Sequence, residues 1–420
     1  MNILLINPPI YDFAVYDFWM KPLGLLYLSS LLKKEKHKVG LLDVPNRFDP
    51  YFKNTKSDSF GRGKIQSQKV PKPEILKDMP GKFKRYGIPE KVIRERIRDF
   101  NPEVVMLTCS MTYWYPGLIE IKEIIKSLGI KPVLLLGGIY ASLLGEHARK
   151  LGFDRVYSKK ENYIEEIDLE IPENFSSFPP PDYSHYSNLS YACLSTSIGC
   201  PFNCPYCSSS YFCKIKEDKE EEQIAEEIYH LYKKGIKRFA FYDDALLITQ
   251  ERLISLCEKI REKGISASFF TPNGLHSRFI SAEVAHFMFK TGFKEPRISL
   301  ETADEKIQEK LSTKTSNYEF ERAVENLKSA GYRKENIYTY LLAGAPGISF
   351  KSVEQSILYV AKTGVKISLA EFSPIPKTKM EENLPDPLLT NNTVYYHYKK
   401  KEKEMVKVKK LTKEVNRRIG

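Results

Sequence analysis

The stretch YACLSTSIGCPFNCPYC, residues 191–207, joins a short apolar segment to three closely spaced cysteines. Its first part carries no charged residue, which is typical of a buried strand, and the following glycine and prolines predict that the strand ends in a loop. Cys200, Cys204 and Cys207 therefore lie in a loop directly after a predicted strand, with the spacing C-x3-C-x2-C. What these cysteines can bind depends on the fold to which this strand belongs.

Apolar segments and amphipathic segments alternate after this stretch. Strands are predicted at 191–199, 237–244, 266–272, 296–302, 336–344 and 366–374, with helices at 218–234, 249–264, 281–291, 317–330 and 351–362. Strands that are separated by helices form parallel sheets, and a closed barrel of this kind needs eight strands. The sequence therefore predicts a partial (β/α)6 TIM-type barrel over residues 191–376.

A similar alternation precedes the cysteines. Four apolar segments read NILLINPP (2–9), VGLLDV (39–44), EVVMLTCS (103–110) and PVLLLGG (132–138), and helical patterns separate them. Strands that are apolar throughout are covered on both faces, as in open parallel sheets. We therefore expect an N-terminal doubly wound, Rossmann-like parallel sheet, so that the fold class is α/β with two different α/β domains.

The remaining segments set the expected domain limits. The first domain spans 1–165 and contains a long polar insert at about 45–88, predicted to be a lid or a mobile surface excursion. Residues 166–190 are rich in proline, serine and aromatic residues and are predicted to be a linker. The basic segment 377–420 is predicted to be a helical tail that packs its apolar positions inward.

The bulk composition restricts the class of protein. The chain has 420 residues, of which 42% are hydrophobic and 28% are charged, as expected for a folded protein of two domains. It contains no apolar run near the roughly 20 residues of a membrane span, and its N-terminus lacks signal-peptide features, so we expect a cytoplasmic protein. Seven cysteines without a signal peptide predict reduced thiols. The net charge is +12, but the lysines are spread along the chain and mixed with many glutamates, which argues against nucleic-acid binding.

Thiolates select zinc or iron–sulfur clusters. A closed zinc site uses four ligands, usually as two separated pairs, so that Cys193 or Cys213 would have to supply the fourth. Three thiolates on a cluster of four irons instead leave one iron without a protein ligand, which can bind a substrate or a cosubstrate.

The C-x3-C-x2-C run, with Tyr206 directly before the third cysteine, resembles the radical S-adenosylmethionine superfamily. The resemblance implies that Cys200, Cys204 and Cys207 bind a [4Fe–4S] cluster, with Tyr206 beside the adenine. It also implies that the open iron chelates the amino and carboxylate groups of S-adenosylmethionine. One electron from the cluster then cleaves S-adenosylmethionine to methionine and a 5′-deoxyadenosyl radical, and an external donor such as flavodoxin or ferredoxin supplies that electron.

Further residues at the predicted strand ends match the superfamily. The resemblance implies that S-adenosylmethionine is also contacted by Asp243, Asp244, Asn273, Glu301 and Gly344. The two aspartates follow the second strand and would approach the methionine moiety, although either could instead cap the following loop. Glu301 would lie near the ribose or the amino group, and Gly344 would let the backbone approach the adenosyl portion.

The motifs NPP…PLGLLYLSSLL, TCSMTYWYPG and VLLLGGIYASLLGEHA resemble the cobalamin-binding-like domain that precedes the barrel in a large radical S-adenosylmethionine subfamily. The resemblance implies that the corrin lies over the strand ends and that the nucleotide tail enters beside the sheet. The implied contacts are Thr108, Ser110, Gly137 and Gly138.

The first domain departs from cobalamin-binding proteins in two ways. The Asp-x-His-x-x-Gly motif, which supplies a lower ligand in other cobalamin proteins, is absent, as it commonly is in this subfamily. The turn VYSKKENYIEE stands where relatives tend to have a Gly-Glu-Gly-Glu-like turn. A sheet that serves substrate binding or packing without cobalamin therefore remains an alternative.

The leading hypothesis is an enzyme that methylates an unactivated carbon with cobalamin. One S-adenosylmethionine would methylate cob(I)alamin, and a second would generate the radical that activates the substrate. A radical rearrangement, cyclisation or other carbon–carbon bond formation without methyl transfer is an alternative, as are a non-catalytic iron–sulfur protein and, because of the basic tail, a modifier of RNA. No motif identifies the substrate, for which a small molecule is the first hypothesis.

Overall fold

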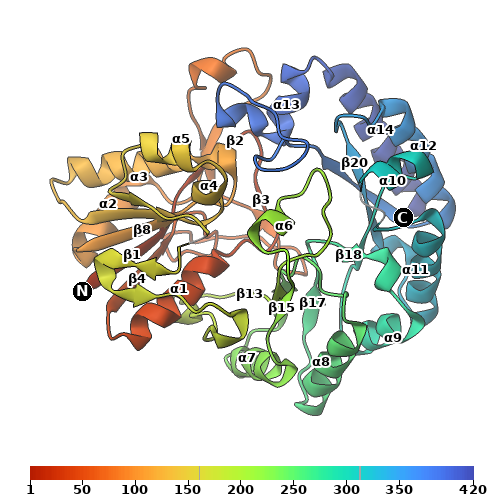
Figure 1. The fold of residues 1–420 in the computed structure, drawn as a ribbon, viewed down its shortest axis with the longest axis horizontal. Helices are drawn as coiled ribbons and strands as arrows, with labels where there is room; N and C mark the ends of the chain where they lie inside the picture. The colour runs from red at the N-terminus through yellow and green to blue at the C-terminus, as the bar shows by residue number, and fades with distance from the viewer. Residues whose placement is uncertain (160, 312–313) are drawn as a thin grey trace. The chain divides into compact units, whose positions relative to one another are not determined.

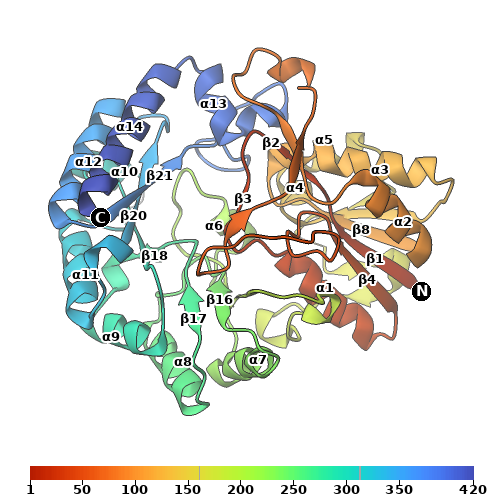
Figure 2. The same cartoon turned by 180° about the vertical axis from the view of Figure 1, so that it is seen from behind.

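The computed structural model describes residues 1–159, 161–311 and 314–420. Lys160, within the VYSKKENYIEE turn, lies outside this description. The chain forms two compact units (Figures 1 and 2). Unit 1 comprises Met1–Ala192 and Leu384–Thr390, and unit 2 comprises Cys193–Asn383 and Asn391–Gly420.

Unit 1 is built on five parallel strands in the order β10-β9-β8-β1-β4. These strands are β1 (Asn2–Asn7), β4 (Lys38–Asp43), β8 (Val104–Thr108), β9 (Val133–Gly137) and β10 (Arg155–Val156). Apolar side chains of the central strands, such as Ile3, Val104 and Leu135, are almost fully buried. The predicted doubly wound parallel sheet is confirmed.

Helices cover both faces of this sheet. They are α1 (Leu23–Lys34), α2 (Glu90–Phe100), α3 (Pro116–Ser127), α4 (Gly138–Leu143) and α5 (Gly145–Lys150). Figures 1 and 2 show α1 on one face and α2 and α3 on the other. The segment that was predicted to be a linker packs within unit 1, where the rings of Phe175 and Phe178 meet the ring of Tyr27 edge-on.

The insert of unit 1 forms small antiparallel sheets that the sequence analysis did not predict. Strands β6 (Ser67–Lys69) and β7 (Lys84–Tyr86) join β2 (Ile10–Asp12) in the order β2-β7-β6. A second pair links β3 (Tyr16–Asp17) to β5 (Gly63–Lys64). The insert is therefore tied by backbone hydrogen bonds to the chain that follows β1.

Unit 2 contains the predicted partial barrel. Its main strands are β13 (Ala192–Leu194), β16 (Arg238–Phe241), β17 (Ser268–Phe270), β18 (Leu275–His276), β19 (Arg297–Glu301), β20 (Tyr338–Ala343) and β21 (Lys366–Glu371). They form two sheets, in the orders β13-β16-β17 and β18-β19-β20-β21. β17 lies within the predicted third strand, 266–272, and β18, which follows a turn at 271–274, was not predicted.

Helices flank the strands of unit 2 on the outside (Figure 1). They are α7 (Glu221–Lys233), α8 (Gln250–Glu262), α9 (Ala282–Thr291), α10 (Glu305–Leu311), α11 (Asn317–Ala330) and α12 (Phe350–Thr363). Unit 2 also contains the short helices α6 (Ser209–Phe212) and α13 (Asn392–Tyr398). This arrangement confirms the expected partial TIM-type fold. None of the helices in the described parts of the chain is both long enough and apolar enough to cross a membrane.

The basic tail forms α14 (Glu402–Ile419), which packs against α12 and β21. Met405, Val408 and Val415 of this helix are buried. The side-chain amide of Asn416 accepts a hydrogen bond from the Ile367 backbone N–H at 2.9 Å and donates one to its carbonyl at 2.8 Å. Because β21 is the last strand of its sheet, these bonds satisfy backbone groups at an edge strand.

Replacing Asn416 by Ala tests how firmly α14 holds this edge. Two partly buried hydrogen bonds are lost, each contributing about 0.5–1.5 kcal/mol. We expect the melting temperature to fall by about 2–4 °C for each kcal/mol, as is usual for domains of 150–250 residues. Glu414→Ala, at an exposed position of the same helix, is the control for helix propensity. Equal melting temperatures of the two variants would show that Asn416 does not anchor the helix.

Candidate active site

The cysteine loop leaves β14 (Ser197–Ile198) through a turn that requires glycine. Gly199 has a φ of +87°, and a Cβ added there would lie 2.6 Å from the carbonyl oxygen of Ile215. The next residue, Cys200, donates its backbone N–H to the Cys213 carbonyl at 3.0 Å. The loop is therefore held against the chain that follows α6. Any residue other than glycine at position 199 would be strained.

Cys200, Cys204 and Cys207 line one cavity of about 400 Å³ in unit 2. Burial raises the pKa of Cys200 to about 11 and also raises the pKa of Cys207. A metal centre binds thiolates, so that its insertion here displaces protons from these thiols. Three thiols in one cavity, of which Cys200 and Cys204 are buried and Cys207 is half-buried, form a soft donor set that fits an iron–sulfur cluster.

The two aspartates after β16 point to different places. Asp244 lines the cavity and accepts a hydrogen bond from the Ser209 hydroxyl at 2.8 Å. Asp243 is buried and does not line the cavity. It accepts hydrogen bonds of 2.6 to 3.1 Å from the backbone N–H and hydroxyl groups of Thr196 and Ser197. Asp243 thus holds the strand that leads into the cysteine loop.

Of the other residues expected to contact S-adenosylmethionine, three line the cavity and one does not. Tyr206, Asn273 and Glu301 line the cavity. The Asn273 amide donates to the Tyr242 carbonyl at 2.8 Å. Gly344 is not part of the lining, and a Cβ added to it would lie 3.1 Å from the side chain of Met405 in α14. At Gly344 the structure therefore shows helix packing, whereas the resemblance implied a contact with the adenosyl group.

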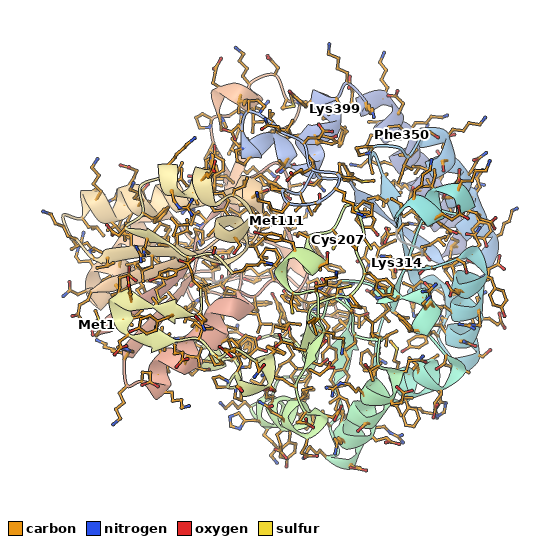
Figure 3. The ribbon with its side chains drawn as sticks, viewed as in Figure 1. Met1, Met111, Cys207, Lys314, Phe350 and Lys399 are labelled. Carbon is orange, nitrogen blue, oxygen red and sulfur yellow. The ribbon has the colours of Figure 1, made fainter. Side chains whose placement is uncertain are left out.

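Lys314 is a cavity residue that the sequence analysis missed. Its ammonium group donates to a Glu301 carboxylate oxygen at 2.9 Å and lies 5.7 Å from the centre of the Tyr206 ring (Figure 3 labels Lys314 and Cys207). Burial lowers the pKa of Lys314, but the neighbouring Glu301 carboxylate and the Cys204 side chain raise it overall. Glu301 adopts a φ of +67°, a strained conformation that brings its carboxylate to this ion pair.

Unit 1 has its own cavity, of about 240 Å³, at the carboxyl ends of β8 and β9. Its lining includes Thr108, Gly137 and Gly138, whereas Ser110 is exposed and lies outside it. Gly138 has a φ of +85°, and an added Cβ would lie 2.3 Å from the Thr108 hydroxyl oxygen. Most other lining side chains are apolar, among them Leu25, Leu28, Leu135, Ile164 and Phe178.

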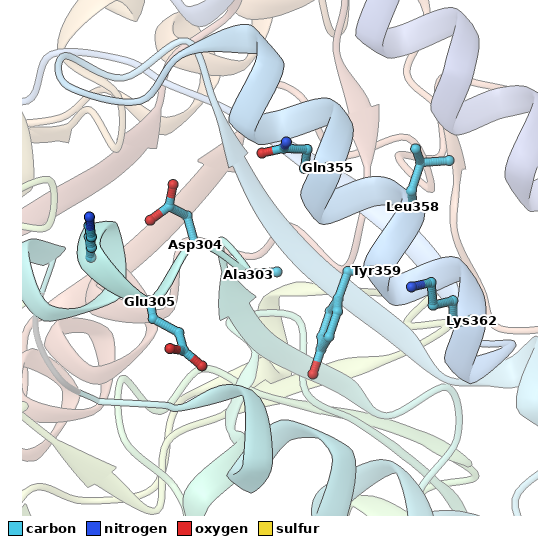
Figure 4. Close-up of a pocket in the computed structure, with 8 residues that line it drawn as sticks. Ala303, Asp304, Glu305, Gln355, Leu358, Tyr359 and Lys362 are labelled. Carbon is cyan, nitrogen blue, oxygen red and sulfur yellow. The ribbon is translucent and has the colours of Figure 1, made fainter.

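A third depression, of about 630 Å³, lies between α10 and α12 (Figure 4). Figure 4 shows that charged and polar side chains, including Glu305, Gln355 and Lys362, surround it. It is open to solvent and contains none of the predicted site residues. The two cavities that contain predicted residues are therefore the sites to compare with known proteins.

Residues 194–360, which contain the cysteine loop and most of the barrel, match the Radical SAM superfamily. These residues form a domain of the radical SAM superfamily. Members of this superfamily use a [4Fe–4S] cluster and S-adenosylmethionine, and the barrel of unit 2 is the radical SAM domain of this chain. The chain is therefore an enzyme of the radical SAM type.

One similar protein is the uncharacterized methyltransferase PH0819 of Pyrococcus horikoshii. It is 26% identical over 406 residues, which cover 91% of this chain and 83% of the relative. The match extends beyond the radical SAM domain and includes most of unit 1.

Solved structures share the fold over both units. The radical SAM methyltransferase TsrM of Kitasatospora setae was solved with tryptophan substrate and a SAM analogue. It has a TM-score of 0.62 at 15% identity, and the match covers 90% of this chain and 74% of the TsrM chain. The cobalamin-dependent radical enzyme OxsB, solved with aqua-cobalamin and S-adenosylmethionine, has a TM-score of 0.61 at 13% identity. The match covers 96% of this chain and 56% of the OxsB chain. At these identities the likeness shows the fold.

Asp243→Asn tests the anchor of the radical SAM cysteine loop. The amide keeps only one acceptor oxygen and carries no charge, so that the hydrogen bonds from Thr196 and Ser197 weaken from the about 1.5–3 kcal/mol of a bond to a charged group toward the about 0.5–1.5 kcal/mol of a neutral one. We expect a lower denaturation midpoint and less iron per chain after anaerobic reconstitution, although all three cysteines remain. Asp99→Asn, at an exposed position of α2, is the matched control. Full iron content in the Asp243 variant would contradict the anchoring role.

Proposed function

We propose that this radical SAM enzyme is a cobalamin-dependent methyltransferase that methylates an unactivated carbon of a small-molecule substrate. One observation carries the proposal. The radical SAM unit has a cavity lined by three cysteines, and the Rossmann-like unit of the same chain has an apolar cavity at the ends of its central strands. A reaction with two cofactors accounts for both cavities.

The first cavity fits the cluster and S-adenosylmethionine. Cys200, Cys204 and Cys207 would hold the cluster, which when bound supplies the electron that cleaves S-adenosylmethionine. Glu301 and Lys314 place one negative and one positive charge at the same cavity. These charges complement the ammonium and carboxylate groups of the amino-acid part of S-adenosylmethionine, and Asp244 and Asn273 would line the remaining wall.

The second cavity fits the apolar base of a cobalamin nucleotide tail. Its glycines leave room beside the sheet, since a Cβ added to Gly137 would meet no atom within 4 Å. Thr108 lies opposite Gly138 and offers a hydroxyl group at the rim. TsrM and OxsB, which share this fold, have been solved with cobalamin. Bound here, cobalamin would supply the methyl group.

The chemistry of the two cofactors favours an unactivated carbon as acceptor. A nucleophilic oxygen, nitrogen or sulfur atom can take a methyl group directly from S-adenosylmethionine and needs no radical. A carbon without an acidic proton must first lose a hydrogen atom, for which a 5′-deoxyadenosyl radical is suited. A barrel cavity that excludes water would protect such a radical from quenching.

The partners and location follow from the same chemistry. Radical SAM enzymes generally need an electron donor, and we propose a flavodoxin or a ferredoxin in this role. The seven cysteines of the chain are thiols in the structure, and none of them is joined in a disulfide. Since free thiols persist in reducing compartments, we propose that the enzyme works in the cytoplasm.

Filling the unit 1 cavity tests the proposed cobalamin site. Gly24 of α1 lines this cavity, and a Cβ added there would meet no atom within 4 Å. Gly24→Phe should therefore fold and occupy the space of the nucleotide tail. We expect wild-type protein made anaerobically with cobalamin to contain nearly stoichiometric cobalt, and the Phe variant to lose at least nine-tenths of it while keeping its iron.

Gly24→Ala adds only one methyl group to the same cavity and is the matched control, which should retain cobalt. Cobalt and iron are measured by elemental analysis, and the corrin by its visible spectrum. Full iron and sulfide without cobalt in the wild type would contradict the cobalamin proposal. Equal cobalt in the wild type and the Phe variant would place cobalamin outside this cavity.

A further inference from the structure

Strand β21 forms an open edge of the unit 2 barrel. It is the last strand in the order β18-β19-β20-β21, and no other strand in the described parts of the chain pairs with it. Lys366 and Phe372 donate their N–H groups to backbone carbonyls on the β20 side, at 2.9 Å each. Successive peptide groups of a strand point to opposite sides in the plane of the sheet. The N–H and carbonyl groups of Ile367, Leu369 and Glu371 therefore point away from β20, toward the open edge.

One of these three edge positions is already occupied within the chain. The side chain of Asn416 bonds both the N–H and the carbonyl of Ile367, as a neighbouring strand would. Leu369 and Glu371 are half-buried, and in the part of the chain that the structure describes no group bonds their backbone on the open side. Unpaired backbone groups at a sheet edge are a template for a further strand.

A groove of about 580 Å³ runs beside these two residues. Leu369 and Glu371 form one wall, and Thr412, Lys413 and other residues of α14 form the opposite wall. Figure 2 shows α14 in the outer layer of unit 2, next to α12. The helix therefore borders the open edge of β21 and leaves space along it.

The groove is basic. Its lining includes four basic side chains, those of Lys366, Lys409, Lys413 and Arg417. Its acidic groups are the side chain of Glu371, which pairs with Lys409 at 2.8 Å, and the carboxylate of Gly420. The other three basic side chains form no ion pair within the described residues, so that the groove keeps a net positive charge. Unpaired cations attract a partner that carries carboxylates.

The two features together select the class of partner. Nucleic acid would meet the positive charges but has no alternating N–H and carbonyl groups with which to continue the sheet. A second copy of this chain could pair edge to edge, but this would bring two basic grooves together. An extended acidic segment of another protein meets both requirements, because its backbone continues the ladder and its carboxylates complement the groove.

We propose that the edge of β21 is a docking site for an extended, acidic segment of a partner protein, which adds to the sheet as a further strand. The N–H and carbonyl groups of this segment bond those of Leu369 and Glu371, and its carboxylates face Lys413 and Arg417. Asn416 limits the added strand at one end, because it occupies the preceding edge position.

The docked segment would lie directly beside a strand of the active site. Ala370, between the two edge residues, lines the cavity of the cysteines. The partner would therefore be held next to the radical SAM cavity. This inference goes beyond the proposed function and does not depend on cobalamin.

The test is the binding of a defined peptide to the full chain with its cluster reconstituted. The probe is a fluorescein-labelled, capped peptide of alternating glutamate and valine, and its affinity is measured by fluorescence anisotropy. A peptide with lysine in place of glutamate is the control for charge. We expect the acidic peptide to bind and the basic one not to bind.

Leu369→Pro tests the pairing of the backbone. Proline removes the N–H at the open edge and is tolerated at edge strands where that group has no partner in the chain. Leu369→Ala keeps the N–H and is the matched control for the lost side chain. We expect the Pro variant to bind the acidic peptide about fivefold more weakly than the Ala variant, as the loss of one hydrogen bond implies.

Lys413→Glu tests the charge of the groove by a change on the surface of α14. Lys410→Glu makes the same change at an exposed position of the same helix outside the groove and is the matched control. We expect the Lys413 variant to bind about threefold more weakly than its control at low salt. This difference should shrink as the salt concentration rises.

The inference is overturned if the wild type does not bind the acidic peptide, or if it binds the basic peptide equally well. It is also overturned if the Pro and Ala variants of Leu369 bind equally, or if the two lysine variants do. A dimer in sedimentation experiments that Leu369→Pro dissociates would show that a second copy occupies the edge, and would overturn it as well. The proposed function is tested separately, by cobalt content.

Discussion

The buried carboxylate of Asp243 is the contact on which the radical SAM site depends. It lies just after β16 and binds the backbone and hydroxyl groups of Thr196 and Ser197, which precede the cysteine loop. Two neighbouring segments of the barrel are thereby joined at their carboxyl ends. The turn at Gly199 then directs the loop across the cavity, so that Cys200 begins from a fixed point. A cluster needs its three thiolates in one place, and a loop without such an anchor would not hold them there.

Much of the fold could be predicted from the sequence because its strands are apolar throughout and its helices are amphipathic. The short strand β18, which follows the turn at 271–274, and the strands of the insert could not be predicted in this way. Strands of two or three polar residues, such as β6 (Ser67–Lys69), have no periodic pattern and depend on the chain with which they pair. Polar composition alone therefore suggested an excursion where the structure has paired strands.

The candidate site was predictable to the extent that its chemistry depends on local spacing. The cysteine motif, and the glycines after β9, carry their signal within a few residues. Lys314 carries none, because it becomes a cavity residue only when its loop meets Glu301 and the cysteine loop. Asp243 and Asp244 show the same limit, since alternation along the chain could not tell which carboxylate faces the cavity and which faces Thr196. Gly344 fits its predicted turn, but α14 packs against it, a contact with a helix some sixty residues later.

The central claim is that the three cysteines hold a cluster that cleaves S-adenosylmethionine. Its most direct test is the formation of 5′-deoxyadenosine and methionine by anaerobically reconstituted, chemically reduced protein, compared with a Cys204→Ala variant treated in the same way. We predict that the wild type releases both products in equal amounts and that the variant releases neither. Release of 5′-deoxyadenosine by the Cys204→Ala variant, or none by an iron-replete wild type, would contradict this account.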